Sequence, residues 1–145
     1  MEDIIKEKIS ADHLLYVSLK YTKTCDVIMN LLLRWREMID TCIIHLLKDA
    51  KKQGKIKEVS DNAMGRIAEI KKLLKKDKNA IETIDFFMML RKIETLKTER
   101  IGEFRKNVNL KLTFRGEEVN INLEKLKEYA EMLENFIDMT KNRLK

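Results

Sequence analysis

The sequence predicts a mainly α-helical protein: an antiparallel bundle of four to five helices with one β-hairpin, at about residues 107–122, before the C-terminal helix. Three observations predict this fold. The 145 residues contain no proline and only four glycines, so little in the chain would interrupt a helix. Apolar residues recur at steps of three and four over most of the chain, as on the buried face of a helix. The period changes to two only between Val108 and Asn122.

The first helical pattern covers residues 10–53. Apolar or small residues at steps of three and four are expected on one face of a helix; they are Ala11, Leu14, Ser18, Tyr21, Cys25, Ile28, Leu32, Trp35, Ile39, Cys42 and Leu46. Thr24 followed by Asp26 is also a possible cap, so the region is either one helix or two helices broken near residue 23. Gly54 predicts the end of the pattern.

Two further helices are predicted in the middle of the chain. Ser60-Asp61 predicts the N-terminal cap of a helix that continues to about residue 76. Asp77 or Asn79 would cap the next helix, which we expect over residues 80–104.

Residues 107–122 carry the signal of a β-hairpin. Apolar and polar residues alternate on both sides of Arg115-Gly116-Glu117, as they do when a tight turn joins two strands. Two strands alone are only marginally stable in water, so one face of the hairpin must lie on the helices or on a second hairpin. Asn122 then caps a C-terminal helix, and the whole chain is expected to form one domain.

The net charge of +6, from 30 basic and 24 acidic residues, is localised. Residues 48–78 contain eleven bases and five acids, whereas residues 117–138 contain seven acids and two bases. Lysine dominates the basic residues, as on thermophile surfaces, and residues 48–78 contain no aromatic side chain for stacking on bases. The stretch is therefore either a solvated surface or a footprint for a phosphate backbone. The residues expected to contact nucleic acid in the second case are Lys51, Lys52, Lys55, Lys71, Lys72, Lys75, Lys76 and, outside the stretch, Arg105.

Motifs of the common enzyme classes are missing from the sequence. The four glycines are isolated, so there is no phosphate-binding loop, and no Cys-x-x-Cys or Glu-x-x-His occurs. His45 could in principle bind a metal together with Cys42 and Asp49, but a surface histidine is the simpler interpretation, and we expect no metal and no cofactor.

The two cysteines, Cys25 and Cys42, would lie about 25 Å apart on one helix, which is too far for a disulfide. We expect both to be reduced thiols in the core. No apolar stretch approaches the length of a membrane span, and residues 1–10 mix acidic and basic side chains, so we expect a cytoplasmic protein without a membrane partner.

Two stretches resemble small archaeal HEPN-like helical bundles. The stretch from Ala11-Asp12-His13-Leu14-Leu15-Tyr16-Val17 through Thr41-Cys42-Ile43-Ile44-His45-Leu46-Leu47 resembles their first two helices, and Glu103-Phe104-Arg105-Lys106-Asn107-Val108 resembles the end of their penultimate helix. The resemblance implies a dimer, and in ribonucleases of this type an Arg, followed after four to six residues by a His, lies at a shared cleft. After Arg105 the positions for this His hold Leu110, Lys111 and Leu112, so the resemblance implies a bundle that lacks the nuclease site.

Three classes of function follow from these observations. The leading prediction is a non-catalytic helical module for protein–protein interaction or assembly, as a homodimer. The predicted dimer interface draws on Trp35, Met88, Met89, Phe114 and Tyr129. The alternative is a nucleic-acid (RNA) backbone-binding protein that uses residues 48–78. The third class is an unrecognised enzyme, such as a divergent HEPN-type ribonuclease, for which the sequence offers no catalytic residue.

Overall fold

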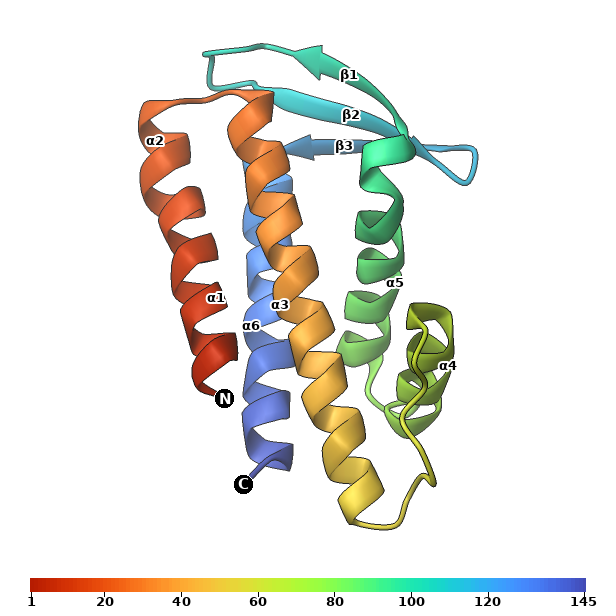
Figure 1. Cartoon of the computed structure of the whole chain (residues 1–145). Helices are drawn as coiled ribbons and strands as arrows, with labels where there is room; N and C mark the ends of the chain where they lie inside the picture. Colours follow the sequence, from red (N-terminus) through yellow and green to blue (C-terminus); the bar gives the residue numbers. More distant parts are fainter.

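The fold is arranged around two long helices, α3 (Cys25–Lys52) and α6 (Leu123–Arg143), in a computed structural model that describes all 145 residues. On one side lies a helical segment made of α1 (Glu2–His13), a π-helical turn (Leu14–Ser18) and α2 (Leu19–Tyr21). On the other side lie α5 (Lys78–Lys92) and the shorter α4 (Ala63–Leu73), and a sheet covers one end (Figure 1). The mainly helical class is confirmed, and none of the helices combines the length and apolarity needed to cross a bilayer.

The predicted helical region 10–53 is two helices. The chain is extended at Thr22 and Thr24, and Thr24 Oγ1 accepts a hydrogen bond from Val27 N at 3.3 Å, which caps α3. The predicted beginning at residue 10 is wrong, because α1 begins at Glu2 and Ile4 lies in the core. The predicted end is confirmed, since α3 ends at Lys52 and Gly54 follows with a positive φ.

The next two helices are shorter than predicted. Asn62, rather than Ser60-Asp61, caps α4 by accepting a hydrogen bond from Gly65 N at 2.7 Å, and α4 ends at Leu73. Asp77 caps α5 through Ala80 N at 3.0 Å, which confirms one of the two predicted caps.

The prediction of a helix to residue 104 is wrong, because α5 ends at Lys92. A 3-10 turn (Ile93–Thr95) follows it, and strand β1 (Lys97–Ile101) follows the turn. All five residues of β1 are exposed, so the strand has no alternation of buried and exposed positions that the sequence could reveal.

The predicted hairpin is present and is part of a three-stranded sheet. Strands β2 (Asn109–Phe114) and β3 (Glu117–Asn122) pair antiparallel, and β1 pairs with the other edge of β2. Arg115 and Gly116 both have positive φ, as a two-residue turn of type I′ requires. One face of the sheet packs into the core, through the buried side chains of Leu110, Leu112 and Ile121.

The loop between β1 and β2 is tightly constrained. Gly102 has φ +67°, and a Cβ there would lie 2.8 Å from the carbonyl oxygen of Asn107. Phe104 also has a positive φ, its backbone N–H donates to Lys23 O at 2.7 Å, and its side chain is 76% exposed. The loop is therefore fixed against the turn between α2 and α3.

Two of the three glycines with positive φ, Gly102 and Gly116, give a test of this packing. Gly116→Ala should lower the free energy of unfolding by about 1–2 kcal/mol, because an L-residue is strained at positive φ and no atom lies within 4 Å of the new Cβ. Gly102→Ala should cost more, because it adds the contact with Asn107 to the same strain. Urea unfolding followed by circular dichroism measures both, and equal losses would contradict the close approach at Gly102.

Candidate functional site

The outer face of the N-terminal helical segment carries apolar side chains that nothing in the chain covers. Ile4, Ala11, Leu15 and Leu19 face the core, whereas Ile9 and Tyr16 are 64% and 61% exposed. Before the π-helical turn, at about 100° per residue, the outward side chains from Glu2 to His13 fall within about 100° of the helix circumference. We call this surface the α1 face; it consists of Glu2, Ile5, Lys6, Ile9, His13, Tyr16, Val17 and Lys20.

The π-helical turn explains how this face stays continuous. Ala11, Leu15 and Leu19 follow one another at steps of four, and all three are buried. Each step of four drifts by about 40° in an α-helix, and the π-helical turn at Leu14–Ser18, which has more residues per turn, offsets this drift. The turn therefore keeps Leu15 and Leu19 in the core and leaves Tyr16 and Val17 exposed.

Charge is distributed unevenly along the α1 face. Glu2 lies at its beginning and Lys20 at its end, about 27 Å away at 1.5 Å per residue. Neither side chain forms an ion pair within the chain. The face thus begins at Glu2 and ends at Lys20, and between them it carries Ile5, Ile9, Tyr16 and Val17 together with Lys6 and His13.

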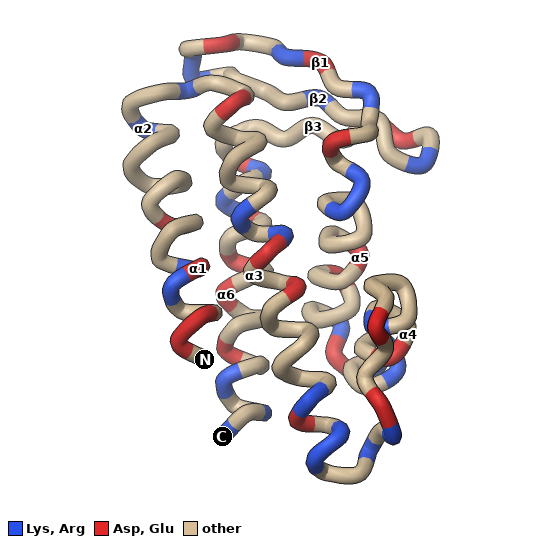
Figure 2. The backbone as a smooth tube through the Cα atoms, viewed as in Figure 1, with Lys and Arg blue, Asp and Glu red and all other residues tan.

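A second surface lies where α3, α4 and α6 end and α5 begins, at the lower end of the molecule (Figure 2). A depression of about 650 Å³ is lined there by Lys72, Lys75, Lys76, Lys78 and Arg143. None of these five cations forms an ion pair, and the nearby Asp77 carboxylate accepts the capping hydrogen bond of α5. We call this surface the basic end.

The predicted nucleic-acid residues are only partly brought together. Lys72, Lys75 and Lys76 line the depression, and Lys55 lines an adjoining one that shares Arg143. Lys51 and Lys52 end α3 nearby, and Lys51 pairs with Glu58. Lys71 instead pairs with Asp85 of α5 at 3.2 Å. Arg105 lies in the β1–β2 loop, at the opposite end of the molecule (Figure 1).

The predicted interface residues divide between the core and the surface. Trp35, 3% exposed, and Met89 are buried inside the single chain, so their apolar surface is already covered. Tyr129 stacks on Phe86 with ring centroids 4.1 Å apart, and burial raises the pKa of its phenol to about 12. Met88 and Phe114 instead line a groove of about 520 Å³ between α4, α5 and the hairpin turn.

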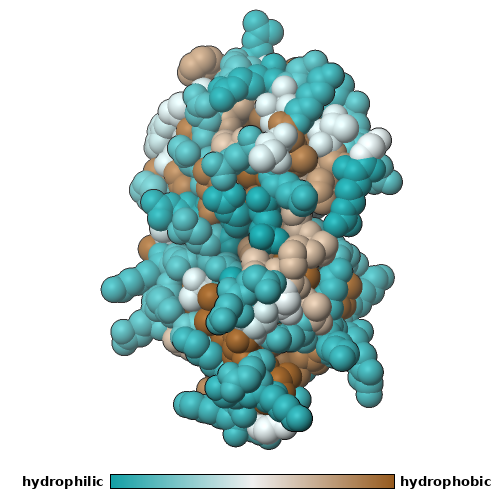
Figure 3. All heavy atoms as spheres, turned by 45° about the vertical axis from the view of Figure 1, so that its right-hand side comes forward, coloured by the Kyte–Doolittle hydropathy of each residue, from teal (hydrophilic) through white to brown (hydrophobic).

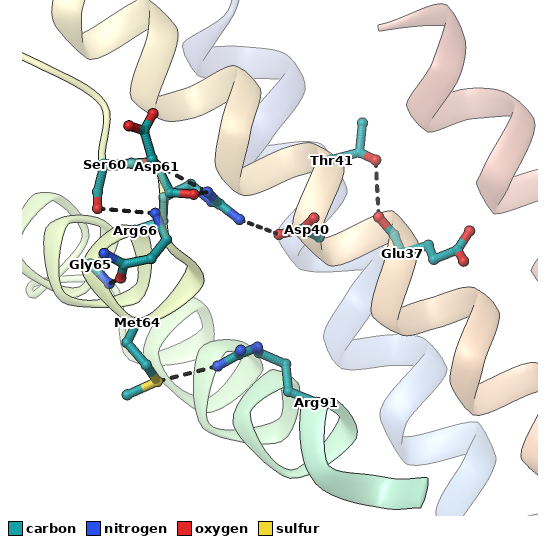
Figure 4. Close-up of polar contacts among 10 residues, drawn as sticks. Glu37, Asp40, Thr41, Ser60, Asp61, Met64, Gly65, Arg66 and Arg91 are labelled. Carbon is teal, nitrogen blue, oxygen red and sulfur yellow. Dashed lines mark hydrogen bonds and ion pairs between the residues drawn. The ribbon is translucent and has the colours of Figure 1, made fainter.

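A polar network beside this groove fixes α4 against α3. Arg66 donates to the carbonyl oxygens of Ser60 and Asp61 at 3.3 and 3.0 Å, and its guanidinium lies 3.9 Å from the Asp40 carboxylate (Figure 4). Arg91 of α5 reaches Met64 Sδ of α4 at 3.2 Å. The Arg66–Asp40 contact joins α4 to α3 and the Arg91–Met64 contact joins α5 to α4, so the position of α4 depends on both arginines.

The candidate metal ligands are not brought together. His45 Nε2 lies 2.9 Å from Asp3 Oδ2, and this contact lowers the pKa of Asp3 to about 2. Asp49 accepts a hydrogen bond from Gln53, and Cys42 is buried. No group of three or more His, Cys, Asp or Glu side chains in the structure is arranged to hold a metal ion.

The three positions at which the HEPN-type pattern would place a His after Arg105, residues 110–112, lie in strand β2. Leu110 and Leu112 are buried against the helices, and Lys111, on the other face, pairs with Glu118 at 3.2 Å. No family model, curated protein or solved structure matches this chain. The resemblance to HEPN-like bundles therefore stays a prediction.

The sequence interpretation missed the α1 face because it began the first helix at residue 10. Ile4, Ile5 and Ile9 carried a signal, since their steps of one and four place Ile4 and Ile9 on different faces of a helix. An apolar residue on each side of a helix indicates that one side lies in the core and the other needs a second partner.

Both thiols should be unreactive in the folded protein. Burial raises the pKa of Cys25, and it raises that of Cys42 to about 12. A rise of about three units leaves about a thousandth of the usual thiolate, which is the nucleophile. A disulfide reagent at about pH 8 should therefore modify neither thiol until denaturant is added. If one thiol per native chain reacted as soon as the reagent was mixed in, the result would contradict the burial of the thiols.

Proposed function

We propose that this chain is a non-catalytic interaction module that assembles as a homodimer through the α1 face. One observation carries the proposal: the N-terminal helical segment exposes four apolar side chains, Ile5, Ile9, Tyr16 and Val17, on one face between Glu2 and Lys20. Isolated exposed apolar residues are normal on a protein surface, but several on one face of a helix are typical of a helix that packs on a partner.

An antiparallel pairing of two copies satisfies the charges of the face. With a two-fold axis near residue 11, Glu2 meets the partner's Lys20, and Ile5 meets the partner's Val17. Lys6 then lies by the partner's Tyr16, where a cation–π contact is possible, and Ile9 lies by the partner's His13. A parallel pairing would instead place Glu2 beside Glu2 and Lys20 beside Lys20.

The expected affinity is modest. The segment from Glu2 to Tyr21 is about 30 Å long, so one helix pair buries an area at the low end of stable interfaces. We therefore expect a dissociation constant on the order of micromolar.

Sedimentation over a range of concentrations tests the dimer. Wild type should change from monomer to dimer between about 1 and 200 µM. Ile9→Glu should remain monomeric, because it places two carboxylates in the apolar middle of the interface. Phe104→Glu is the control, since it removes an apolar side chain at the sheet end that is even more exposed than Ile9. A wild-type protein that is still monomeric at about 200 µM would refute the proposal.

A charge exchange tests the antiparallel arrangement. Lys20→Glu should weaken the dimer because it opposes the partner's Glu2, and the double variant Glu2→Lys, Lys20→Glu should restore it. A parallel pairing predicts no such rescue, because each position then meets its own copy and both variants keep like charges together.

The basic end favours a second candidate function, the binding of a phosphate backbone. Five unpaired cations around one depression are the specific observation. Each phosphate contacted by a cation contributes a slope of about −0.7 to log K against log salt for single strands and about −0.9 for duplexes. Five contacts would give about −3.5 to −4.5.

Binding of labelled RNA at about 50 mM salt tests this second candidate. Lys72→Glu with Lys75→Glu and Lys76→Glu should abolish it without changing the melting temperature, because all three side chains lie at the surface. Arg105→Glu is the matched control at the opposite end and should leave the affinity unchanged. Absence of wild-type binding to single- and double-stranded RNA would reject the candidate.

A further inference from the structure

We propose that the groove between α4, α5 and the hairpin turn binds an acidic amphipathic segment of another protein. Its floor is apolar and consists of Met64, Met88, Leu96 and Phe114, and its rim is basic and consists of Arg91, Lys92 and Arg115. These residues come from three separate parts of the chain, so the groove exists only in the folded protein. It lies away from the α1 face, on the side of the molecule that α4 and α5 form (Figure 1).

The rim cations have no acidic partner. Two other arginines of the chain are paired, Arg36 with Glu94 and Arg100 with Asp26. Arg91, Lys92 and Arg115 have no carboxylate within 4.0 Å. Arg91 contacts only a sulfur, and Arg115 lies over the Phe114 ring at 4.8 Å. Three unpaired positive charges around one groove favour an acidic ligand.

The floor favours apolar side chains. Met64 is 55% exposed, and the other three floor residues are only half-buried. Figure 3 shows brown and tan surface exposed among hydrophilic atoms on this side of the molecule. Methionine side chains are flexible and polarizable, so they adapt to inserted apolar groups, as on surfaces that bind amphipathic helices.

The apolar floor and the basic rim together indicate which kind of ligand the groove binds. A phosphate backbone would engage the rim and leave the methionines without a partner. The chain's own acidic helix α6 is excluded, because Leu126, Leu133 and Ile137 of its apolar face lie in the core. A segment from another protein, with apolar residues at steps of three and four and carboxylates between them, satisfies both parts of the groove.

The experiment uses a defined probe. The probe is a labelled peptide of about 16 residues, designed with leucines on one helical face and glutamates at the other positions. Its binding to the full chain is measured by fluorescence anisotropy. Two reference peptides are a scrambled sequence of the same composition and a version with lysine in place of every glutamate. The dissociation constant for the acidic amphipathic peptide should be on the order of 10–100 µM. Binding should be at least tenfold weaker for the scrambled peptide and absent for the lysine version.

Variants of the groove locate the binding. Met64→Glu, at an exposed position, should weaken binding at least tenfold, and so should the triple variant Arg91→Ala, Lys92→Ala and Arg115→Ala. The triple variant introduces no new charge but also removes the Arg91–Met64 contact. The double variant Lys92→Ala with Arg115→Ala keeps that contact, and it should still weaken binding if the charge of the rim contributes. The matched control is Lys72→Ala with Lys75→Ala and Lys76→Ala, which removes three cations at the basic end and should leave the affinity unchanged.

The outcomes separate this proposal from the others. Equal binding of the scrambled peptide would show attraction by charge alone, and an equal loss in the basic-end control would place the peptide elsewhere; either result overturns the proposal. No wild-type binding at millimolar peptide also overturns it. Because Ile9→Glu lies outside the groove, that variant should bind the peptide as wild type does, whatever its oligomeric state. Circular dichroism melting confirms that each variant is folded.

Discussion

Burial of α3 is the constraint on which the rest of the structure depends. Between Met38 and Leu47 no residue of this helix is exposed, and its buried positions extend around about half of its circumference. One neighbouring helix cannot cover so wide a surface. The N-terminal segment, α4, α5 and α6 all pack on α3, and β2 of the sheet contacts it at one end. Trp35, in the middle of α3, lies within 6.5 Å of both Phe86 and Tyr129 by ring centroid and so joins α3 to α5 and α6.

The peripheral elements are covered on one side only, and this is why the candidate surfaces lie on them. The N-terminal segment turns Ile4 and Leu19 toward the core and leaves Ile9 and Tyr16 outside. The short helix α4 buries Ile67 and Ile70 but leaves Met64 exposed beside the groove. A helix at the centre has no free apolar face, whereas a helix at the edge has one whenever its sequence is apolar on two sides. The two surfaces therefore follow from the arrangement around α3.

Local signals in the sequence predict much of this fold. The caps at Thr24, Asp77 and Asn122 and the turn at Arg115-Gly116 depend on a few neighbouring residues, and each forms as expected. The extent of α5 depends on distant residues, because Lys97–Ile101 becomes a strand only by pairing with β2. Ile101 and Phe104 lie three residues apart, a helical spacing that extended the predicted helix to residue 104, but both side chains are exposed. Tertiary pairing overrides local propensity at this point.

The candidate surfaces were harder to predict than the fold because they too depend on contacts between residues that are distant in sequence. Met88 and Phe114 were expected at an interface, but nothing in their spacing indicates that a groove would bring them together with Met64 and Arg91. Trp35 and Met89 have the same apolar character and lie in the core. Residue type indicates that a side chain avoids water, and only the packing of α4 on α5 decides whether this chain or another one covers it.

The positions of the α1 face and the groove have a consequence for how the two proposals combine. The α1 face belongs to the segment at one edge of the bundle, and the groove lies beyond α3, by α4 and α5 (Figure 1). A two-fold axis through the α1 face therefore leaves both grooves of a dimer free and directed away from the interface. Such a dimer is bivalent: once one acidic segment is bound, a second segment on the same partner binds at a high effective concentration. The affinity of each single groove for one acidic segment can then be low, because the avidity of two grooves, rather than a large interface, holds the partner. A partner that carries two acidic segments would bind the dimer more tightly than the Ile9→Glu monomer, and a partner with one segment would bind both equally.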